Sequence, residues 1–270
     1  MMSPYLLPAG PVQIAFSGGR TSAFMLHQIL QANGGLPDRV VVSFQNTGRE
    51  MPQTLDFVQE VGERWNVKVV WLEYRGNKPL FEVVSHNSAS RNGEPFEALI
   101  RKKQSLPDQA QKFCSAELKT LTAKRYLRSV GWKSWTSVVG FRADETHRDA
   151  YQDNRATTIL PLRTAGVSKQ DVLSFWAAQP FDLRLPVVRG KTVGGNCDGC
   201  FLKSEAYLSA FARDMPDRHA WWEGREKATG RAFSKRYSRA DLRNYVERQG
   251  DWVLSTAGAL CQKDDGECFA

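Results

Sequence analysis

The sequence predicts an α/β fold, with an open, mainly parallel sheet, helices on both faces and a helical C-terminal extension. Short valine-rich apolar runs recur along the first half of the chain, as in strands that are covered on both faces. Segments of helical periodicity alternate with these runs, as crossover connections between parallel strands do. At 270 residues, of which 41% are hydrophobic, the chain is long enough for one large domain with an appendage.

The expected elements follow one another along the chain. Strands are expected at residues 12–16, 39–47, 67–74 and 134–141. Helices are expected at residues 22–30, 53–65 and 115–130. Pro52 fits the first turn of the second of these helices, because proline lacks an N–H that the turn would leave unpaired. Capping-box spacing predicts two further helix starts, at Ser168 with Asp171 and at Ser238 with Asp241.

Three polar segments follow expected strands, at residues 17–22, 46–50 and 140–145. Open parallel sheets bind ligands beyond the carboxyl ends of their strands. We therefore expect the three segments to share one site. Residues 75–113 carry few periodic signals, and we expect a mobile or partly helical insertion over that site.

The composition excludes several classes of protein. No apolar run approaches the roughly 18 residues that a membrane span needs, and the first residues lack the pattern of a secretory signal. A cytoplasmic location with no membrane partner is therefore expected. The five cysteines are an odd number, which disfavours a disulfide framework in such a chain.

The net charge of +8 predicts acidic partners, and much of the excess lies near the C-terminus. Cations of residues 213–248 alternate there with aromatic residues such as Trp221, Trp222 and Phe233. Aromatic rings of this kind stack on bases while the cations contact phosphates, which would indicate nucleic-acid binding. A solvated helical face with its aromatic residues in the core explains the pattern equally well. Both interpretations stay open from the residues alone.

A glycine turn, FSGGRTS, joins the first expected strand to the first expected helix. The N-terminus of a helix favours negative charge, and glycine lets the backbone approach an anion closely. The turn therefore predicts a phosphate site, with an ordinary strand-to-helix connection as the alternative. It matches neither of the common nucleotide motifs, G-x-x-x-x-G-K-[ST] and G-x-G-x-x-G.

The turn resembles the PP-loop, the SGG-x-[DT]-S signature of the adenine nucleotide alpha-hydrolase superfamily. Further motifs follow in the order of the phosphoadenosine phosphosulfate (PAPS) reductase family and its phage and DNA-modification relatives: NTGREMPQTLDFV, CSAELKTL, GFRADETHRD, LPL and GNCDGC. The resemblance covers most of residues 11–203. It implies a nucleotide-binding domain over residues 1–203, with a basic helical extension over residues 204–270 packed on it.

The resemblance implies a set of nucleotide-binding residues: Ser17, Gly18, Gly19, Arg20, Thr21, Ser22, Asn46, Thr47, Gly48 and Arg142. It also implies that Lys119 and Arg142 reach toward the phosphates as catalytic residues. Many relatives carry aspartate where this chain has Thr21, so Mg²⁺ at this position is an open question. For Glu50 we weigh a metal ligand against a helix start, and we favour the helix start.

Cysteines suggest a metal centre. Cys197 and Cys200 form C-x-x-C in a glycine-rich turn, and Cys114 stands at an expected helix start. With Cys261 or Cys268 they make four thiolates, which suit zinc or a [4Fe-4S] cluster. Resemblance to cluster-containing adenylyl-sulfate reductases favours iron, although Ser115 stands where those proteins have a further ligand. Either a C-terminal cysteine replaces that ligand or the cluster has an open iron site. We favour a cluster held by Cys114, Cys197, Cys200 and Cys268.

Two enzyme hypotheses follow from the resemblance. In the first, the protein cleaves ATP to AMP and pyrophosphate and activates a substrate, such as DNA or tRNA, for sulfur transfer from a cysteine desulfurase or another sulfur donor. In the second, it is an adenylyl-sulfate or PAPS reductase that releases sulfite, draws on a thiol reductant and uses Cys268 as its nucleophile. The chain ends in ECFA where such reductases have ECG-[LI]-H, which favours the first hypothesis. A nucleic-acid-binding module with a vestigial nucleotide site is a third interpretation.

Overall fold

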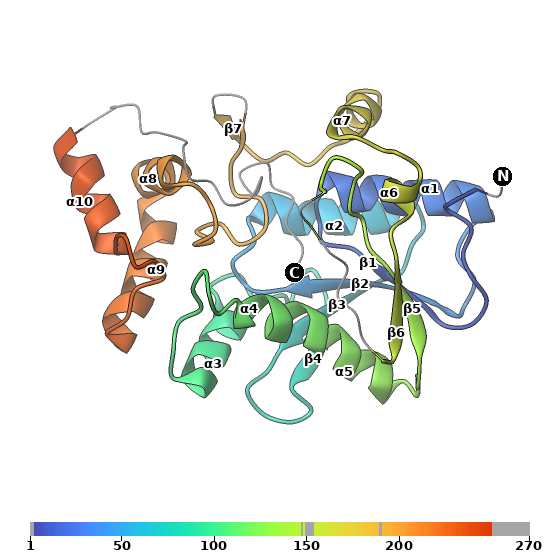
Figure 1. The fold of residues 1–270 in the computed structure, drawn as a ribbon, viewed down its shortest axis with the longest axis horizontal. Coiled ribbons are helices and arrows are strands. Elements are labelled where there is room, and N and C mark those ends of the chain that lie inside the picture. Colours follow the sequence, from blue (N-terminus) through green and yellow to red (C-terminus); the bar gives the residue numbers. More distant parts are fainter. Residues whose placement is uncertain (1–2, 147, 149–153, 189–190, 250–270) are drawn as a thin grey trace.

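The computed structural model describes residues 3–146, 148, 154–188 and 191–249. Its centre is a six-stranded sheet in the order β4-β3-β2-β1-β5-β6 (Figure 1). The strands are β1 Val12–Ala15, β2 Val40–Asn46, β3 Val69–Tyr74, β4 Phe81–Val84, β5 Trp135–Val138 and β6 Ala156–Ile159. All neighbouring pairs are parallel except β3 with β4. The predicted class, α/β with an open and mainly parallel sheet, is confirmed.

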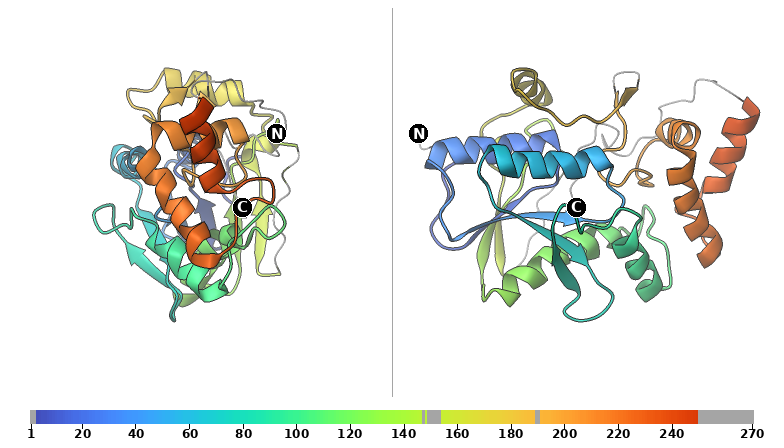
Figure 2. Two further views of the ribbon diagram at one scale, coloured as in Figure 1. Left: turned by 90° about the vertical axis from the view of Figure 1, so that its left-hand side faces the viewer. Right: turned by 180° about the vertical axis from the view of Figure 1, so that it is seen from behind.

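Helices cover both faces of the sheet. The helical segments are α1 Arg20–Asn33, α2 Pro52–Arg64, α3 Glu94–Lys103, α4 Phe113–Ser115, η1 Ala116–Leu121, α5 Thr122–Ser129, α6 Pro161–Thr164, α7 Lys169–Ala177, α8 Glu205–Asp214, α9 Pro216–Thr229 and α10 Arg239–Gln249. Helices α1 and α2 lie on one face, and η1 and α5 lie on the other (Figures 1 and 2). No helix in the described ranges has both the length and the apolar surface to cross a membrane.

The C-terminal helices α8, α9 and α10 lie beyond the end of the sheet toward which β2 points (Figures 1 and 2). A short hairpin of β7 Val187–Val188 and β8 Lys191–Thr192 precedes them. Helix α8 begins directly after the predicted boundary at residue 203. This end of the sheet is where the carboxyl ends of the parallel strands lie, so the extension faces the loops in which a ligand is expected.

The local signals in the sequence produce the expected elements. The first three residues of strand β1 are buried and the last is half-buried, because the strand lies between β2 and β5 and is covered on both faces. Pro52 opens α2, as predicted. The capping box before α7 is formed, since the Ser168 hydroxyl accepts from the Asp171 N–H and the Asp171 carboxylate accepts from the Ser168 N–H. Ser238 and Asp241 make the same reciprocal pair before α10.

Three features differ from the expectation. The edge strands β4 and β6 were not predicted, because FEVV and ATTI are short and lack the continuous apolar run of a central strand. Residues 75–113 contain the helix α3, in agreement with a partly helical insertion, and also the strand β4, which was not expected. The helix expected at residues 115–130 is interrupted by the π-helical segment η1, which carries Lys119.

Two main hydrophobic clusters stabilise the fold. The first lies between the sheet and the helices α1, α2 and α7. The second joins α3 and η1 to the C-terminal helices, and it contains Phe96, Leu118, Phe201, Trp222 and Phe233. Residues on both sides of the predicted boundary therefore share one core, and the extension is packed against residues that precede it.

Candidate functional site

The order of the strands reverses next to β1. Strands β2 and β3 follow on one side of β1, and β5 and β6 follow on the other. In sheets of this kind, the crevice beyond the carboxyl ends at the reversal is the usual place for a ligand. Here it is flanked by the loop between β1 and α1 and by the loop that follows β5.

The loop between β1 and α1 holds its own shape through two hydroxyl groups. Ser17 Oγ lies 2.9 Å from Ser22 Oγ, which also accepts from the Ser17 N–H at 3.2 Å. Ser22 Oγ lies 3.0 Å from the Gly19 carbonyl oxygen, to which it can donate. The N-cap residue of α1 is Gly19, which has no side chain with which to cap the helix. The positive end of the helix dipole is thus available to an anion, whereas phosphate binding itself stays a prediction.

The two glycines of this loop have different roles. Gly18 has φ +79, and a Cβ there would lie 2.9 Å from both Thr54 Cγ2 and Val58 Cγ2 on α2. Gly18 is therefore required by the backbone and by close packing. Gly19 has φ −98 and ψ 162, an extended conformation that any residue adopts. Only Gly19 can be replaced without straining the backbone.

Arg142 connects the two loops that flank the crevice. Its Nη1 donates to Thr21 Oγ1 at 3.1 Å, from the loop after β5 to the first turn of α1. Its Nε donates to Asp144 at 2.9 Å, and its side chain is 2% exposed. The backbone N–H of Arg142 donates to Glu145, whose other oxygen pairs with Arg148 at 2.7 Å. The guanidinium is thus held at the N-terminus of α1, as a phosphate-binding group would be.

Arg20 is directed elsewhere. Its guanidinium makes a bidentate pair with Asp182, with both nitrogen–oxygen distances at 2.7 Å, and it also donates to the Leu183 carbonyl. The indole of Trp176 donates to the Arg20 carbonyl. Arg20 therefore ties the segment after α7 to the start of α1, and its predicted phosphate contact stays a prediction.

The loop after β2 is closed by its own side chains. The amide of Asn46 donates to Glu73 at 2.6 Å and to the Ser90 carbonyl, and its oxygen accepts from the Gly48 N–H. Gly48 has φ +78, and a Cβ there would lie 3.0 Å from the backbone of Gly93. The side chain of Asn46 is therefore engaged in shaping the loop and in holding the segment around Ser90 against it.

Glu50 closes the same loop from the other end. Its carboxylate accepts from the N–H and the hydroxyl of Thr47, each at 2.9 Å. It precedes α2 by two residues, but the N-cap residue of that helix is Met51 and the Glu50 carboxylate bonds back to Thr47, so the helix-start role stays a prediction. Burial raises the pKa of the Glu50 carboxyl, although the nearby Lys119 and the bonds from Thr47 act in the opposite direction.

Lys119 lies with the cysteines. It stands on the π-helical segment η1, and its Nζ donates to Asn196 Oδ1 at 3.4 Å. Its charge acts on both Glu50 and Cys197. The structure thus brings Lys119 to the C-x-x-C turn and Arg142 to the start of α1. The two cations that were predicted to be catalytic therefore contact different segments.

The three described cysteines contact the same hydrophobic cluster, the one that joins α3 and η1 to the C-terminal helices. Cys197 Sγ lies 3.3 Å from Thr47 Oγ1, and the Cys200 N–H donates to the Cys197 carbonyl, which closes the turn. Burial and the Glu50 carboxylate raise the pKa of the Cys197 thiol well above its ordinary value.

The predicted metal ligands fall partly within the described residues, which hold Cys114, Cys197 and Cys200. Within the described ranges, no three histidine, cysteine or acidic side chains are arranged to hold a metal ion. Cys114, Cys197 and Cys200 alone therefore do not make a complete site. Cys261 and Cys268 lie outside the described residues. The shared metal centre stays a prediction.

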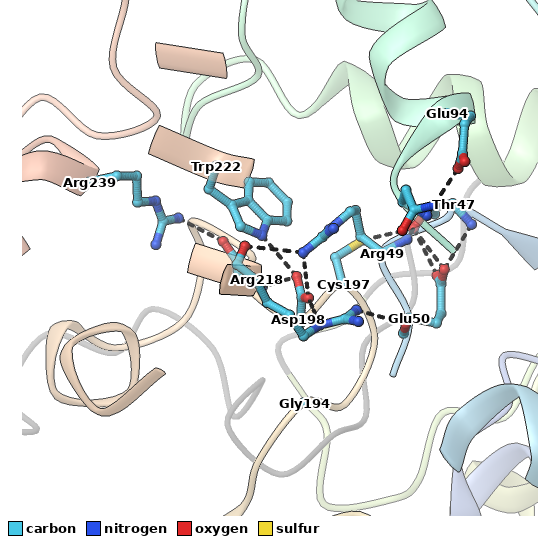
Figure 3. A network of polar contacts seen from close by, with 12 residues as sticks. Thr47, Arg49, Glu50, Glu94, Gly194, Cys197, Asp198, Arg218, Trp222 and Arg239 are labelled. Carbon is cyan, nitrogen blue, oxygen red and sulfur yellow. Dashed lines mark hydrogen bonds and ion pairs between the residues drawn. The ribbon is translucent and has the colours of Figure 1, made fainter. Parts of the chain in front are cut away.

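An aspartate that the sequence reasoning missed organises the C-x-x-C turn (Figure 3). Asp198, the residue after Cys197, is fully buried and accepts from Arg49 at 2.7 Å and from Arg218. Its other oxygen accepts from the indole of Trp222 at 2.8 Å. An aspartate inside C-x-x-C was visible in the sequence, but nothing there indicated partners so far away in the chain.

The basic aromatic region contributes two aromatic rings and one arginine to the core. Trp222, Phe233 and Arg239 are each 1% exposed, and Arg239 donates to the Gly199 carbonyl at 2.6 Å. Trp221 packs under the guanidinium of Arg49 at 4.7 Å. For Trp222 and Phe233 the core interpretation is correct, because buried rings offer no face to a base, whereas Trp221 is only half-buried.

Comparison with known proteins gives two sequence matches. The family model for the phosphoadenosine phosphosulfate reductase domain matches residues 11–158. Over 210 residues the chain is 30% identical to the uncharacterized nin region protein ORF290 of Escherichia phage lambda. That alignment covers 74% of this chain and 69% of the phage protein.

Solved structures resemble the chain at low sequence identity. PAPS reductase from Candida auris, in a phosphate complex, is 18% identical with a TM-score of 0.45, over 69% of this chain and 84% of that one. NMN synthetase from Francisella tularensis is 16% identical with a TM-score of 0.43, over 92% and 90%. The U34-tRNA thiolase NcsA from Methanococcus maripaludis, with its [4Fe-4S] cluster, is 12% identical with a TM-score of 0.40, over 89% and 82%.

Proposed function

The chain belongs to the PAPS reductase domain family of the adenine nucleotide alpha-hydrolase superfamily, and on that premise we propose that it binds an adenine nucleotide where the strand order reverses. The phosphates lie at the start of α1, between the loop after β1 and the loop after β5. The observation that carries this proposal is the hydrogen bond from Arg142 to Thr21, which holds a buried guanidinium beside the uncapped end of α1.

The proposed reaction is cleavage of ATP between the α and β phosphates. An oxygen of the substrate attacks the α-phosphorus, the bond to the β-phosphate oxygen breaks, and pyrophosphate leaves with the bonding electrons. Arg142 and the N–H groups at the start of α1 stabilise the negative charge that develops on the phosphates. A sulfur nucleophile from the donor protein then attacks the adenylated substrate. A bond from the substrate to sulfur forms, the bond from the substrate to the AMP oxygen breaks, and AMP leaves with the bonding electrons.

The C-x-x-C turn adds sulfur chemistry to this proposal. Cys197 lies against Thr47 of the loop after β2, and Lys119 lies beside the turn. Together with Cys114 and Cys268 the turn would hold a [4Fe-4S] cluster, which would bind or relay sulfur. The proposal for nucleotide cleavage does not depend on that cluster.

A second candidate is a sulfonucleotide reductase that releases sulfite from adenylyl sulfate or PAPS. The family match over residues 11–158 favours it, since that domain family is named for phosphoadenosine phosphosulfate reductase. Both candidates use the same phosphate site and differ in the bond that breaks, a P–O bond in the first and the bond to the sulfonate sulfur in the second.

One assay separates the candidates. Anaerobically purified full-length protein is incubated with ATP, adenylyl sulfate or PAPS, with and without a thiol reductant, and pyrophosphate, AMP and sulfite are measured. Pyrophosphate and AMP from ATP support the proposed activity. Release of sulfite from either sulfonucleotide, with ATP left intact, supports the reductase and contradicts the proposed ATP cleavage. Absence of pyrophosphate, AMP and sulfite with all three nucleotides overturns both.

A further inference from the structure

Every polar atom of Asp198 is used. One carboxylate oxygen accepts from Arg49 and Arg218, and the other accepts from the indole of Trp222 and from the Gly199 N–H at 2.7 Å. Its backbone N–H donates to the Arg49 carbonyl at 2.9 Å. Its backbone oxygen accepts from the Tyr207 hydroxyl at 3.2 Å. A buried carboxylate with so complete a set of partners fixes the position of the chain that carries it.

These partners come from two separate parts of the molecule. Arg49 belongs to the loop after β2, whereas Arg218 and Trp222 belong to α9. Arg218 also donates to the Glu50 carbonyl at 2.9 Å, and Arg49 donates to the Arg218 carbonyl at 3.1 Å. The loop and the helix are therefore linked to each other as well as to the turn between them (Figure 3).

Close packing restricts the turn further. A Cβ on Gly199 would lie 2.4 Å from Nε1 of Trp222, so the indole lies directly on the backbone between the two cysteines. On the other side Cys197 contacts Thr47, and Arg239 donates to the Gly199 carbonyl. The turn is thus held by the loop after β2, by α9 and by the first residue of α10.

We propose that Asp198 is a positioning residue that fixes the C-x-x-C turn against the loop after β2, and that α9 serves to complete this support. The use of the turn in sulfur chemistry rests on the proposed function, whereas its positioning does not. Replacing Asp198 with asparagine puts an NH₂ group among donors from Arg49, Arg218 and Trp222, which removes acceptors without changing the size of the side chain.

The test measures alkylation of Cys197 and Cys200 by iodoacetamide in the full-length protein as purified, with mass spectrometry to resolve the sites. Asp198→Asn is expected to raise the alkylation rate at both cysteines at least tenfold under conditions in which circular dichroism shows the variant folded. Glu223→Gln is the matched control, because Glu223 is also a buried acid on α9 that pairs with cations, but those cations, Lys227 and Arg243, lie outside the turn.

A second variant keeps the proposal testable if Asp198→Asn does not fold. Trp222→Phe keeps an aromatic ring but removes the indole donor. It is expected to raise the alkylation rates of Cys197 and Cys200 at least threefold, but less than Asp198→Asn does. Rates in the folded variants that match those of Glu223→Gln would overturn the proposal. Nucleotide turnover is measured in the parent protein separately, so a failure of the proposed function leaves the alkylation result interpretable.

Discussion

The Arg142 guanidinium donates to Thr21 Oγ1 across the point at which the strand order of the sheet reverses. The two residues belong to different loops, and the bond holds a buried cation at the positive end of α1. Two features that attract anions are thus placed at one position by a single contact. The first prediction follows from this pair.

Replacing Arg142 with lysine keeps the charge but loses the planar group that contacts Thr21 and Asp144 together. Hydrogen bonds to charged groups contribute about 1.5–3 kcal/mol, so nucleotide affinity is expected to fall by about ten- to a hundredfold. Calorimetric titration with ATP and adenylyl sulfate measures the change. Arg64→Gln on α2, where the arginine is 46% exposed, is expected to bind like the parent. Equal affinities for the parent and a folded Arg142→Lys variant would contradict the assignment.

Substitutions at the two glycines of the loop between β1 and α1 are expected to have different effects. Gly18→Ala forces a left-handed backbone on alanine and brings its Cβ to 2.9 Å from α2, so the free energy of unfolding is expected to fall by more than about 1 kcal/mol. Gly19→Leu is compatible with φ −98 and ψ 162, and it should retain the fold while its side chain obstructs the start of α1. Its nucleotide affinity is expected to fall at least tenfold.

Urea unfolding and nucleotide titration of both variants check this pair. The prediction for Gly19 is contradicted by a folded Gly19→Leu variant that binds ATP and sulfonucleotides as tightly as the parent. A Gly18→Ala variant as stable as the parent would contradict the role given to the left-handed backbone.

The sequence was sufficient for the parts of the fold that local patterns determine. Strand β1 is covered on both faces, and a strand buried in this way needs a continuous apolar run such as the one at residues 12–16. Ser168 and Asp171 meet within one helical turn, so their pairing is set by spacing alone. The edge strand β6, by contrast, pairs on one side and contains two threonines, so it lacks the apolar run on which the predictions relied.

The site was predictable where residues act through the backbone near them, and not where they act through distant partners. The glycine turn and the C-x-x-C turn were visible as motifs because their spacing is local. The pairing of Arg49 with Asp198 joins residues 149 positions apart, and the pairing of Arg20 with Asp182 joins residues 162 apart. Such pairs depend on how the elements pack, and one sequence carries no signal for them.

The buried Glu50 carboxyl gives a prediction for the dependence of stability on pH. Its pKa is raised by burial above the ordinary value of 4.5, so the folded protein holds this proton more tightly than the unfolded chain does. The free energy of unfolding of the parent, relative to Glu50→Gln, is therefore expected to fall as pH rises from about the ordinary pKa through the raised one, and to level off above it.

Urea unfolding at a series of pH values from weakly acidic to weakly alkaline measures this difference. Glu223→Gln is the control, because hydrogen bonds from Arg243 and Lys227 lower the pKa of Glu223. The stability that Glu223 contributes is present above the ordinary carboxyl pKa and is lost only as pH falls through the lowered one, so its difference from the parent should stay constant over the same range. A constant difference for Glu50→Gln as well would show that the Glu50 pKa is not raised.

The last prediction concerns the cysteines. If Cys114, Cys197, Cys200 and Cys268 hold a [4Fe-4S] cluster, anaerobically purified protein should be brown and contain iron and sulfide, since thiolates hold the iron. Serine at any of these four positions is expected to lower the iron content, whereas Cys261→Ser is expected to spare it. If Cys261→Ser loses iron and Cys268→Ser retains it, Cys261 is the fourth ligand in place of Cys268. Colourless protein with stoichiometric zinc would reject the cluster, because zinc accepts the same four thiolates, and metal-free protein that still turns over nucleotide would reject the metal centre altogether.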